Sequence, residues 1–148
     1  MFEKILVGVD GSESALKAVG VAANLAEAFN GRLVLIHVVQ VSAIAEQALK
    51  VSATAHLSES PKGIMERLSQ DVLDGARERA RAAGLTDQQI STVTADGNQA
   101  RELIKTAKRR KVDLIVVGSR GRGRLEGLLL GSVSQKVSAL SPCPCMIV

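Results

Sequence analysis

The sequence predicts an α/β protein: a Rossmann-like, doubly wound sheet of five parallel strands with helices on both faces. Short apolar runs alternate with longer segments of helical periodicity, which is typical of a parallel sheet covered on both sides. A glycine-rich stretch, residues 118–132, follows the fourth apolar run, where such a sheet carries a loop. The 148 residues have the length of one domain, and we expect residues 1–148 to form it.

The first three elements follow from periodicity and end signals. Residues 4–9 form an apolar run of the length of a buried strand. Asp10 or Ser12 can cap the helix that follows, and Gly31 ends it. The apolar positions of that helix keep a helical period: Ala15, Leu16, Val19, Ala22, Ala23, Ala26 and Phe29. Residues 32–39 are the second strand.

The second half of the chain repeats the alternation. In residues 62–83, apolar side chains recur every four positions from Ile64 to Ala80, and Gly84 follows as a helix stop. The remaining elements are a strand over 90–95, a helix over 99–111, a strand over 113–117, a helix over 132–141 and a strand over 145–148. Residues 40–60 have two interpretations: the segment is a lid or contact segment, or it is an insertion without a function.

Composition excludes several classes of protein. Apolar residues make up 46% and charged residues 23%, which argues against disorder. No apolar run approaches the roughly 18 residues of a membrane span. The first strand begins too early for a signal peptide, so we expect a cytoplasmic protein with no membrane partner. The only aromatic residues are Phe2 and Phe29, so we expect no nucleic acid partner, because single-strand binders use aromatic platforms.

Two local patterns each have two interpretations. The basic run from Lys108 to Lys111 ends a predicted helix, where cations complement the helix dipole and face solvent, or it forms an anion- or nucleic-acid-binding patch. Cys143 and Cys145 face the same side of the last strand. They are a pair of small buried apolar residues or a redox or soft-metal pair, although two thiols alone do not complete a zinc site.

The glycine-rich stretch is the strongest functional signal. Glycines after a strand and before a helix expose backbone N–H groups to an anion, and Arg120, Arg122 and Arg124 add positive charge. The stretch is not a Walker A loop, because Arg124 and Leu125 stand where the lysine and the hydroxyl residue belong. It is not a Rossmann fingerprint either, because Glu126 takes the place of the third glycine.

The spacing of Gly118, Gly121, Gly131 and Ser132 resembles the nucleotide motif of the universal stress protein family, G-x2-G-x9-G-[S/T]. Further segments resemble the first strand with its terminal aspartate, the second and fourth strands, and the last helix of that family: residues 4–12, 35–39, 113–119, 131–137 and 141–144. The resemblance implies the strand order 3-2-1-4-5 and ATP as the ligand, with Mg²⁺ as a possible companion.

The loop and the resemblance together give a set of candidate nucleotide-binding residues. The main chain near Gly8 and Val38 would contact adenine. Asp10 would accept hydrogen bonds from ribose, or hold a divalent metal through water, or only cap a helix. The full set is Gly8, Val9, Asp10, Val38, Gly118, Ser119, Arg120, Gly121, Arg122, Gly123, Arg124, Gly131, Ser132, Val133 and Ser134.

The sequence contains little catalytic chemistry. His37 lies in an apolar strand and is expected to have a structural role, and His56 lies in the open segment. No Ser/His/Asp set, paired carboxylates or metal-ligand cluster stands near the loop. We therefore expect an ATP-binding regulatory module with an unidentified protein partner, not an enzyme, with slow ATP hydrolysis at most. The alternatives are a nucleotide-free dimeric interaction protein and a slow ATPase.

The last strand is expected to form the dimer interface. It spans residues 142–148, from Pro142 to Val148, and should lie at the edge of the sheet. A short apolar edge with free N–H and C=O groups is a natural pairing surface. Antiparallel pairing with a second copy gives a two-fold contact. The resemblance to the universal stress protein family implies the same interface, since many of its members dimerise through this strand.

Overall fold

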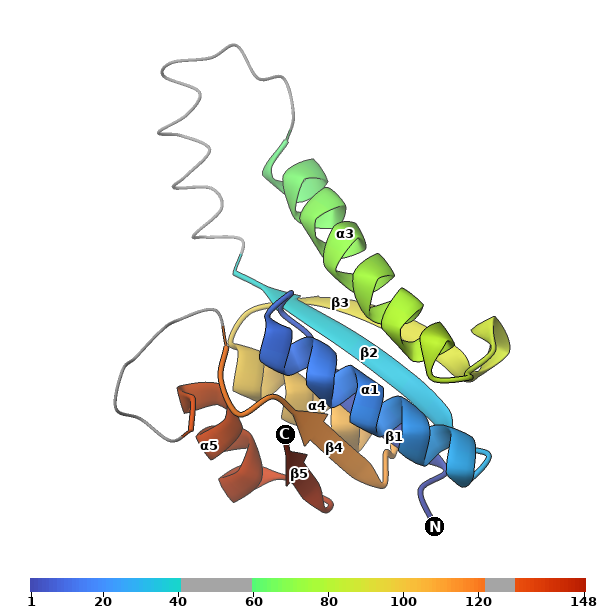
Figure 1. Ribbon diagram of the computed structural model, residues 1–148. Helices are drawn as coiled ribbons and strands as arrows, with labels where there is room; N and C mark the ends of the chain where they lie inside the picture. The colour runs from blue at the N-terminus through green and yellow to red at the C-terminus, as the bar shows by residue number, and fades with distance from the viewer. Residues whose placement is uncertain (41–59, 122–129) are drawn as a thin grey trace.

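The computed structural model describes residues 1–40, 60–121 and 130–148 (Figure 1). Five parallel strands form one sheet in the order β3-β2-β1-β4-β5, which confirms the predicted fold class and strand order. The elements are β1 (Lys4–Gly8), α1 (Glu13–Ala28), β2 (Arg32–Val39), α3 (Pro61–Ala82), the 3₁₀ turn η1 (Asp87–Gln89), β3 (Ile90–Asp96), α4 (Gln99–Arg110), β4 (Leu114–Val117), α5 (Ser132–Leu140) and β5 (Cys145–Ile147).

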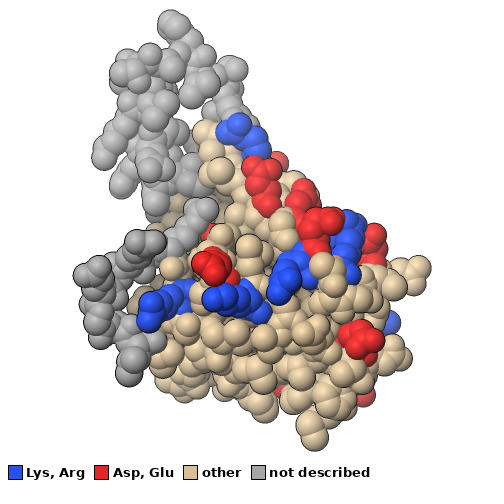
Figure 2. Space-filling model, viewed as in Figure 1, with Lys and Arg blue, Asp and Glu red and all other residues tan. Residues whose placement is uncertain are grey.

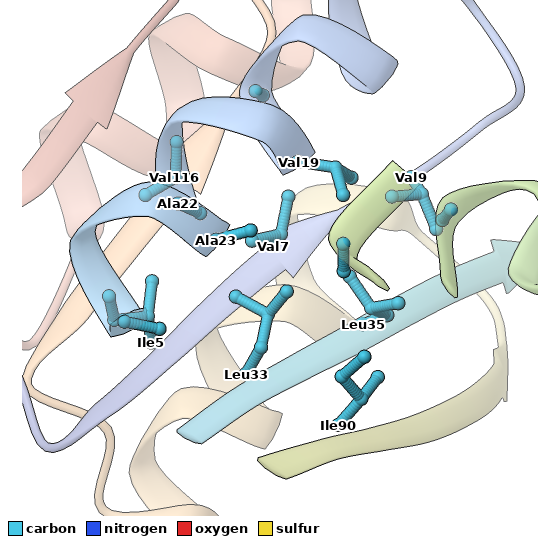
Figure 3. Close-up of a cluster of buried hydrophobic side chains, with 14 of the residues drawn as sticks. Ile5, Val7, Val9, Val19, Ala22, Ala23, Leu33, Leu35, Ile90 and Val116 are labelled. Carbon is cyan, nitrogen blue, oxygen red and sulfur yellow. The ribbon is translucent and has the colours of Figure 1, made fainter. Parts of the chain in front are cut away.

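Two hydrophobic clusters cover the two faces of the sheet, because successive strand residues point to opposite sides. In β1, Ile5 and Val7 face α1 and α3, whereas Leu6 faces α4 and α5. Figure 3 shows the first cluster, in which Val19, Ala22 and Ala23 of α1 meet the strand residues Val7, Leu33 and Leu35. The small alanine side chains of α1 allow the helix to lie close to the sheet.

Some apolar residues do not lie where the periodicity placed them. Phe29 is 44% exposed because it is the C-cap residue of α1, and its ring packs edge-on against Phe2 with centroids 5.4 Å apart. Leu68 is 45% exposed on the first half of α3, a part of the helix that extends beyond the sheet in Figure 1. The turn η1 was also not predicted; it is fixed by Thr86, whose N–H donates to the Gln89 side chain at 3.1 Å.

The strand order positions the site. β1 lies between β2 and β4, with Gly8 beside Ile36 and Val7 beside Val116. The chain leaves β1 toward β2 and β3 and later returns to β4 and β5 on the other side. The connections therefore diverge at the carboxyl end of β1, where doubly wound sheets bind their ligands.

Candidate functional site

A cavity of about 300 Å³ opens at this divergence point. Ile36, Val38, Leu103 and Val117 supply apolar side chains from the cluster between the sheet and helices α4 and α5. The full lining is Gly8, Val9, Asp10, Ala15, Ile36, Val38, Gln99, Leu103, Val117, Gly118, Arg120, Gly121, Leu130, Gly131, Ser132, Val133 and Ser134. An apolar wall with a few polar groups at one side is typical of a small-molecule site.

Asp10 has two roles, one for each carboxylate oxygen. Its Oδ1 accepts a hydrogen bond from the N–H of Ser12 at 2.9 Å and so holds the turn after β1. Ser12, not Asp10, caps α1, since its Oγ accepts from the N–H of Ala15 at 3.2 Å. The other oxygen, Oδ2, faces the glycine loop: a Cβ built on Gly121 would lie 3.1 Å from it. One carboxylate oxygen is thus presented to the cavity.

Gly118 serves packing between elements. A Cβ at this position would lie 2.5 Å from Ser14 Oγ and 2.9 Å from the Ser14 carbonyl carbon, so only glycine lets the end of β4 approach the start of α1 this closely. From the sequence, Gly118 was expected to expose its backbone N–H to an anion, whereas in the structure a glycine is required here by the close packing of β4 against α1. Gly121 differs, because a Cβ added there would meet the Asp10 carboxylate and no backbone atom of the described residues within 4 Å.

Ser119 closes the loop and does not line the cavity. Its carbonyl oxygen accepts from the N–H of Gly131 at 2.7 Å and from the hydroxyl of Ser134 at 3.3 Å. Its N–H donates to the main-chain oxygen of Val148 at 2.6 Å. Ser14 joins this network, because its hydroxyl donates to the same Val148 oxygen at 3.4 Å. Hydrogen bonds thereby join the two described ends of the loop to α5, α1 and the end of β5.

At the start of α5, no described side chain caps the N–H groups of the first turn. Gly131 is the N-cap residue and offers no side chain, whereas Ser12 and Asn98 cap α1 and α4 with side-chain oxygens. The first hydrogen bond of α5 runs from Gln135 N to Gly131 O at 3.1 Å, so the N–H groups of the three residues before Gln135 have no intrahelical acceptor. Those three residues, Ser132, Val133 and Ser134, line the cavity. An uncapped helix start binds anions through these groups and the helix dipole.

The main chain of β2 offers a second set of polar groups. The carbonyl of Ile36 accepts from the N–H of Val9 at 2.9 Å, so it points toward β1. Two residues on, the N–H and C=O of Val38 point the same way, past the end of β1 at Gly8. Val38 lines the cavity, so these groups can read the edge of a planar ring.

The structure gathers most of the candidate residues at one place. Ser119 lies behind the loop, and Arg120 is exposed at the rim, where its N–H donates to Ser14 Oγ at 3.4 Å. Arg122, Gly123 and Arg124 lie outside the described residues. Sequence reasoning missed a group of lining residues: Ala15, Ile36, Gln99, Leu103, Val117 and Leu130. The helical period of residues 99–111 predicts that Leu103 points inward, but its contribution to the cavity depends on how α4 packs on the sheet.

The other titratable groups do not build a second reactive centre. His37 has the expected structural role, with Nδ1 at 3.0 Å from the Oγ of buried Ser69, and His56 lies outside the described residues. Burial raises the pKa of the Cys143 and Cys145 thiols, and both side chains pack against the second cluster, as expected for apolar residues. Within the described ranges, no three His, Cys, Asp or Glu side chains come together as metal ligands.

None of the helices in the described parts of the chain is long and apolar enough to cross a bilayer.

The comparisons with known proteins agree with this geometry. The Universal stress protein family model matches residues 1–148. Universal stress protein YxiE of Bacillus subtilis is 37% identical over 150 residues, covering 100% of this chain and 99% of the relative. The structure of a universal stress protein in complex with cAMP is 30% identical, with a TM-score of 0.71 over 99% of this chain and 96% of that one. A universal stress protein from Archaeoglobus fulgidus in complex with dAMP has a TM-score of 0.68, covering 99% of this chain and 97% of that one; at 17% identity it shows the fold alone. The chain belongs to the universal stress protein family.

Proposed function

We propose that this protein binds ATP in the cavity at the carboxyl end of β1 and acts as a nucleotide-dependent regulatory module in a stress response. The observation that carries the proposal is the uncapped start of α5, which faces the same cavity as Val38, whose main-chain groups point past the end of β1. The first suits phosphate and the second suits a base edge. The relative with bound cAMP, which is 30% identical to this chain, supports an adenine nucleotide as the ligand.

Each part of ATP has a candidate contact. Val38 would meet the adenine edge, and the apolar side chains of Ile36 and Leu103 would contact its ring. Asp10 Oδ2 would accept from a ribose hydroxyl. The N–H groups of Ser132 and Val133 would bind phosphate, whereas the Ser134 hydroxyl already donates to Gly131 O at 2.9 Å and would contribute only its backbone.

The residues present also fit one Mg²⁺ ion bound together with the nucleotide. Mg²⁺ is commonly held by one or two carboxylates, waters and substrate phosphates. Asp10 supplies one carboxylate oxygen at the cavity, and nothing else among the described lining residues is acidic. The ion would then bind only with the phosphates, through Asp10 and water.

We further propose that the protein acts by binding and not by turnover. Phosphoryl transfer needs a positioned base or nucleophile in addition to charge. Among the described lining residues, Asp10 is the only carboxylate and there is no histidine. ATP would stabilise one conformation or assembly that a protein partner recognises. Ser119 gives a structural route for this, because it joins the loop to the end of β5.

Isothermal titration calorimetry tests the binding. ATP with and without MgCl₂, AMP, cAMP, GTP and adenosine are titrated into wild type and into Val133→Pro, which removes one N–H donor in the first turn of α5, where a helix tolerates proline. We expect ATP to bind wild type, GTP to bind at least tenfold more weakly, and Val133→Pro to lose affinity for ATP more than for adenosine. No heat with any nucleotide at millimolar concentration would contradict the proposal and favour the nucleotide-free dimeric alternative.

A phosphate-release assay tests the absence of turnover. Purified protein is incubated with excess ATP and Mg²⁺, with Asp10→Ala as the matched variant. We expect less than one phosphate per chain over hours in both. Repeated turnovers that Asp10→Ala abolishes would show the slow ATPase instead.

A further inference from the structure

A second hollow lies on the outside of the molecule between α4 and α5. It has a volume of about 850 Å³, larger than the nucleotide cavity, and lies where these two helices meet. Its described lining shares no residue with the described lining of the proposed nucleotide site. The residues are Asn98, Ala100, Arg101, Ile104, Lys105, Lys108, Arg109, Lys136 and Leu140. We call it the α4–α5 groove.

The groove combines rows of cations with an apolar line. On α4, Arg101, Lys105 and Arg109 follow one another at a spacing of four and therefore form one row along the helix. Ala100 and Ile104 form the neighbouring row. On α5, Lys136 and Leu140 are also four apart, and the Leu140 side chain is 65% exposed. Among the described residues, the groove thus contains five cationic residues, no carboxylate and an exposed leucine.

The positive charge of the groove is mostly not neutralised by the protein itself. Lys105 lies 3.6 Å from Glu102, and this is the one ion pair that a groove residue makes with a described acidic residue. The opposite face, which carries α1 and α3, is different: it mixes acidic and basic side chains (Figure 2). There Lys17 pairs with Glu13, and Arg77 and Arg81 pair with Asp87. The groove is therefore a local excess of positive charge.

We propose that the α4–α5 groove binds an acidic amphipathic helix of a partner protein. Charge complementarity requires carboxylates in the ligand, and the exposed leucine beside Ile104 requires apolar side chains between them. From Ala100 to Arg109 the groove extends about 14 Å at about 1.5 Å per residue, which matches two to three turns of a helix laid along it. Apolar anchors at helical spacing, flanked by acidic residues, fit this surface in the helix-in-groove mode.

The same observations disfavour two other polyanions. A bilayer surface is flat, so it would not fill a hollow between two helices. Single-stranded nucleic acid is held by aromatic side chains on which bases stack, and none lines the groove. This inference does not depend on nucleotide binding, since the groove and the nucleotide cavity have no lining residue in common.

Fluorescence anisotropy with a defined probe tests the proposal, without nucleotide. The probe is a fluorescein-labelled, capped 14-residue helical peptide with leucines at spacings of three and four and glutamates beside them. Two control peptides replace every leucine by glutamine or every glutamate by glutamine. We expect the probe to bind wild type with an affinity that falls as NaCl rises, and both controls to bind at least tenfold more weakly.

Matched variants then locate the binding surface. Lys108→Glu with Lys136→Glu reverses one charge on each wall of the groove, and we expect at least a tenfold loss of affinity. Arg32→Glu with Lys62→Glu makes the same change in net charge on exposed residues outside the groove, and we expect less than a twofold loss. Leu140→Ser leaves the charge unchanged and should lower the affinity for the probe at least threefold.

Three outcomes would overturn the proposal. The first is that the probe does not bind. The second is that both double variants lower the affinity for the probe equally, which would indicate attraction by net charge alone. Alternatively, a 16-nucleotide single strand or phosphatidylserine vesicles bind more tightly than the peptide and lose affinity in the groove variant, which would assign the surface to a different polyanion. Circular dichroism and thermal unfolding of each variant show that it remains folded.

Discussion

At Gly118 and Gly121, two positions of the same motif, the lack of a side chain has different physical consequences. Gly118 is required because the backbone of β4 passes against the backbone of α1, and a side chain would collide with Ser14. Among the described residues, a Cβ added to Gly121 would meet only the carboxylate of Asp10, and the φ of Gly121 lies outside the left-handed region, so its backbone conformation does not require glycine. The two positions can therefore be separated by experiment into one that affects folding and one that affects binding.

The Gly118→Ala variant is expected to lose stability. Its Cβ would lie 2.5 Å from Ser14 Oγ and 3.0 Å from the N of Ala15, so α1 and β4 must separate. Overpacking of this kind costs about 1–3 kcal/mol. Urea unfolding followed by circular dichroism measures the change in the free energy of unfolding. A value within error of wild type would contradict the close approach of β4 and α1.

The Gly121→Val variant is expected to keep its stability and lose ATP. The branched side chain would fill the space next to Asp10 Oδ2, with its Cβ 3.1 Å from that oxygen. We expect affinity to fall at least tenfold, equivalent to about 1.4 kcal/mol, in calorimetry. Gly75→Val is the matched control, because a Cβ added to Gly75 on α3 would have no atom within 4 Å. Unchanged affinity in folded Gly121→Val would count against the phosphate cradle.

At the scale of elements, the start of α5 distinguishes this helix from its neighbours. α1 and α4 begin with side-chain caps from Ser12 and Asn98, which satisfy donors that would otherwise bind a ligand. α5 begins with Gly131, whose φ of −69° and ψ of 157° suit any residue. The glycine is thus not required by its dihedral angles, and we infer that it leaves the donors of α5 free for an anion.

The Gly131→Asp variant tests this inference. A carboxylate at the N-cap would accept from the N–H groups of α5 and place a negative charge where phosphate would bind. A Cβ at this position meets Ser119 O at 3.4 Å, an ordinary contact, so we expect stability to be unchanged or slightly higher. Calorimetry should show at least a tenfold loss of ATP affinity for Gly131→Asp and a smaller loss for the neutral cap Gly131→Ser. Equal affinities for Gly131→Asp and wild type would show that phosphate does not bind at this helix.

The elements themselves were predictable because their signals are local. The apolar run at residues 4–9 and the capping residue Ser12 predict β1 and α1 to within a residue. The role of Gly118 was not predictable, since it depends on the backbone of α1, about a hundred positions away in the chain. The same limit applies to Leu103 and Gln99, whose periodicity is local but whose position at the cavity depends on the packing of α4 against β1 and β2.

At the scale of the molecule, β5 connects the candidate site to the edge of the sheet. Pro144 O accepts from Ile115 N at 3.0 Å and Val148 N donates to Val117 O at 3.0 Å, so both residues face β4. By strand alternation, Cys145 and Ile147 direct their N–H and C=O groups outward, away from β4. The missing N–H of Pro144 therefore does not interrupt the outer edge. The edge is short, apolar and open, as a pairing strand should be.

We propose that two copies pair antiparallel along this edge, with Met146 on the two-fold axis. Cys145 would then lie opposite the partner's Ile147, and the two pairs related by the axis would exchange four hydrogen bonds. This register uses only the outward groups and leaves the β4–β5 pairing intact. It also brings the two Val148 residues, each bonded to Ser119 of its own glycine loop, close to the interface. Nucleotide binding and assembly would be coupled through this contact.

The Ile147→Pro variant is expected to shift the dimer to monomer without unfolding the protein. Proline removes the N–H of this residue, which faces outward and makes no hydrogen bond to β4, and proline is tolerated on edge strands. Two of the four intermolecular hydrogen bonds would be lost. Ile147→Ala is the matched control, since it removes most of the side chain but keeps the N–H. Sedimentation velocity at tens of micromolar should show a dimer for wild type and for Ile147→Ala, and at least tenfold weaker association for Ile147→Pro. A monomeric wild type, or equal association of the two variants, would exclude pairing through the outward groups of β5.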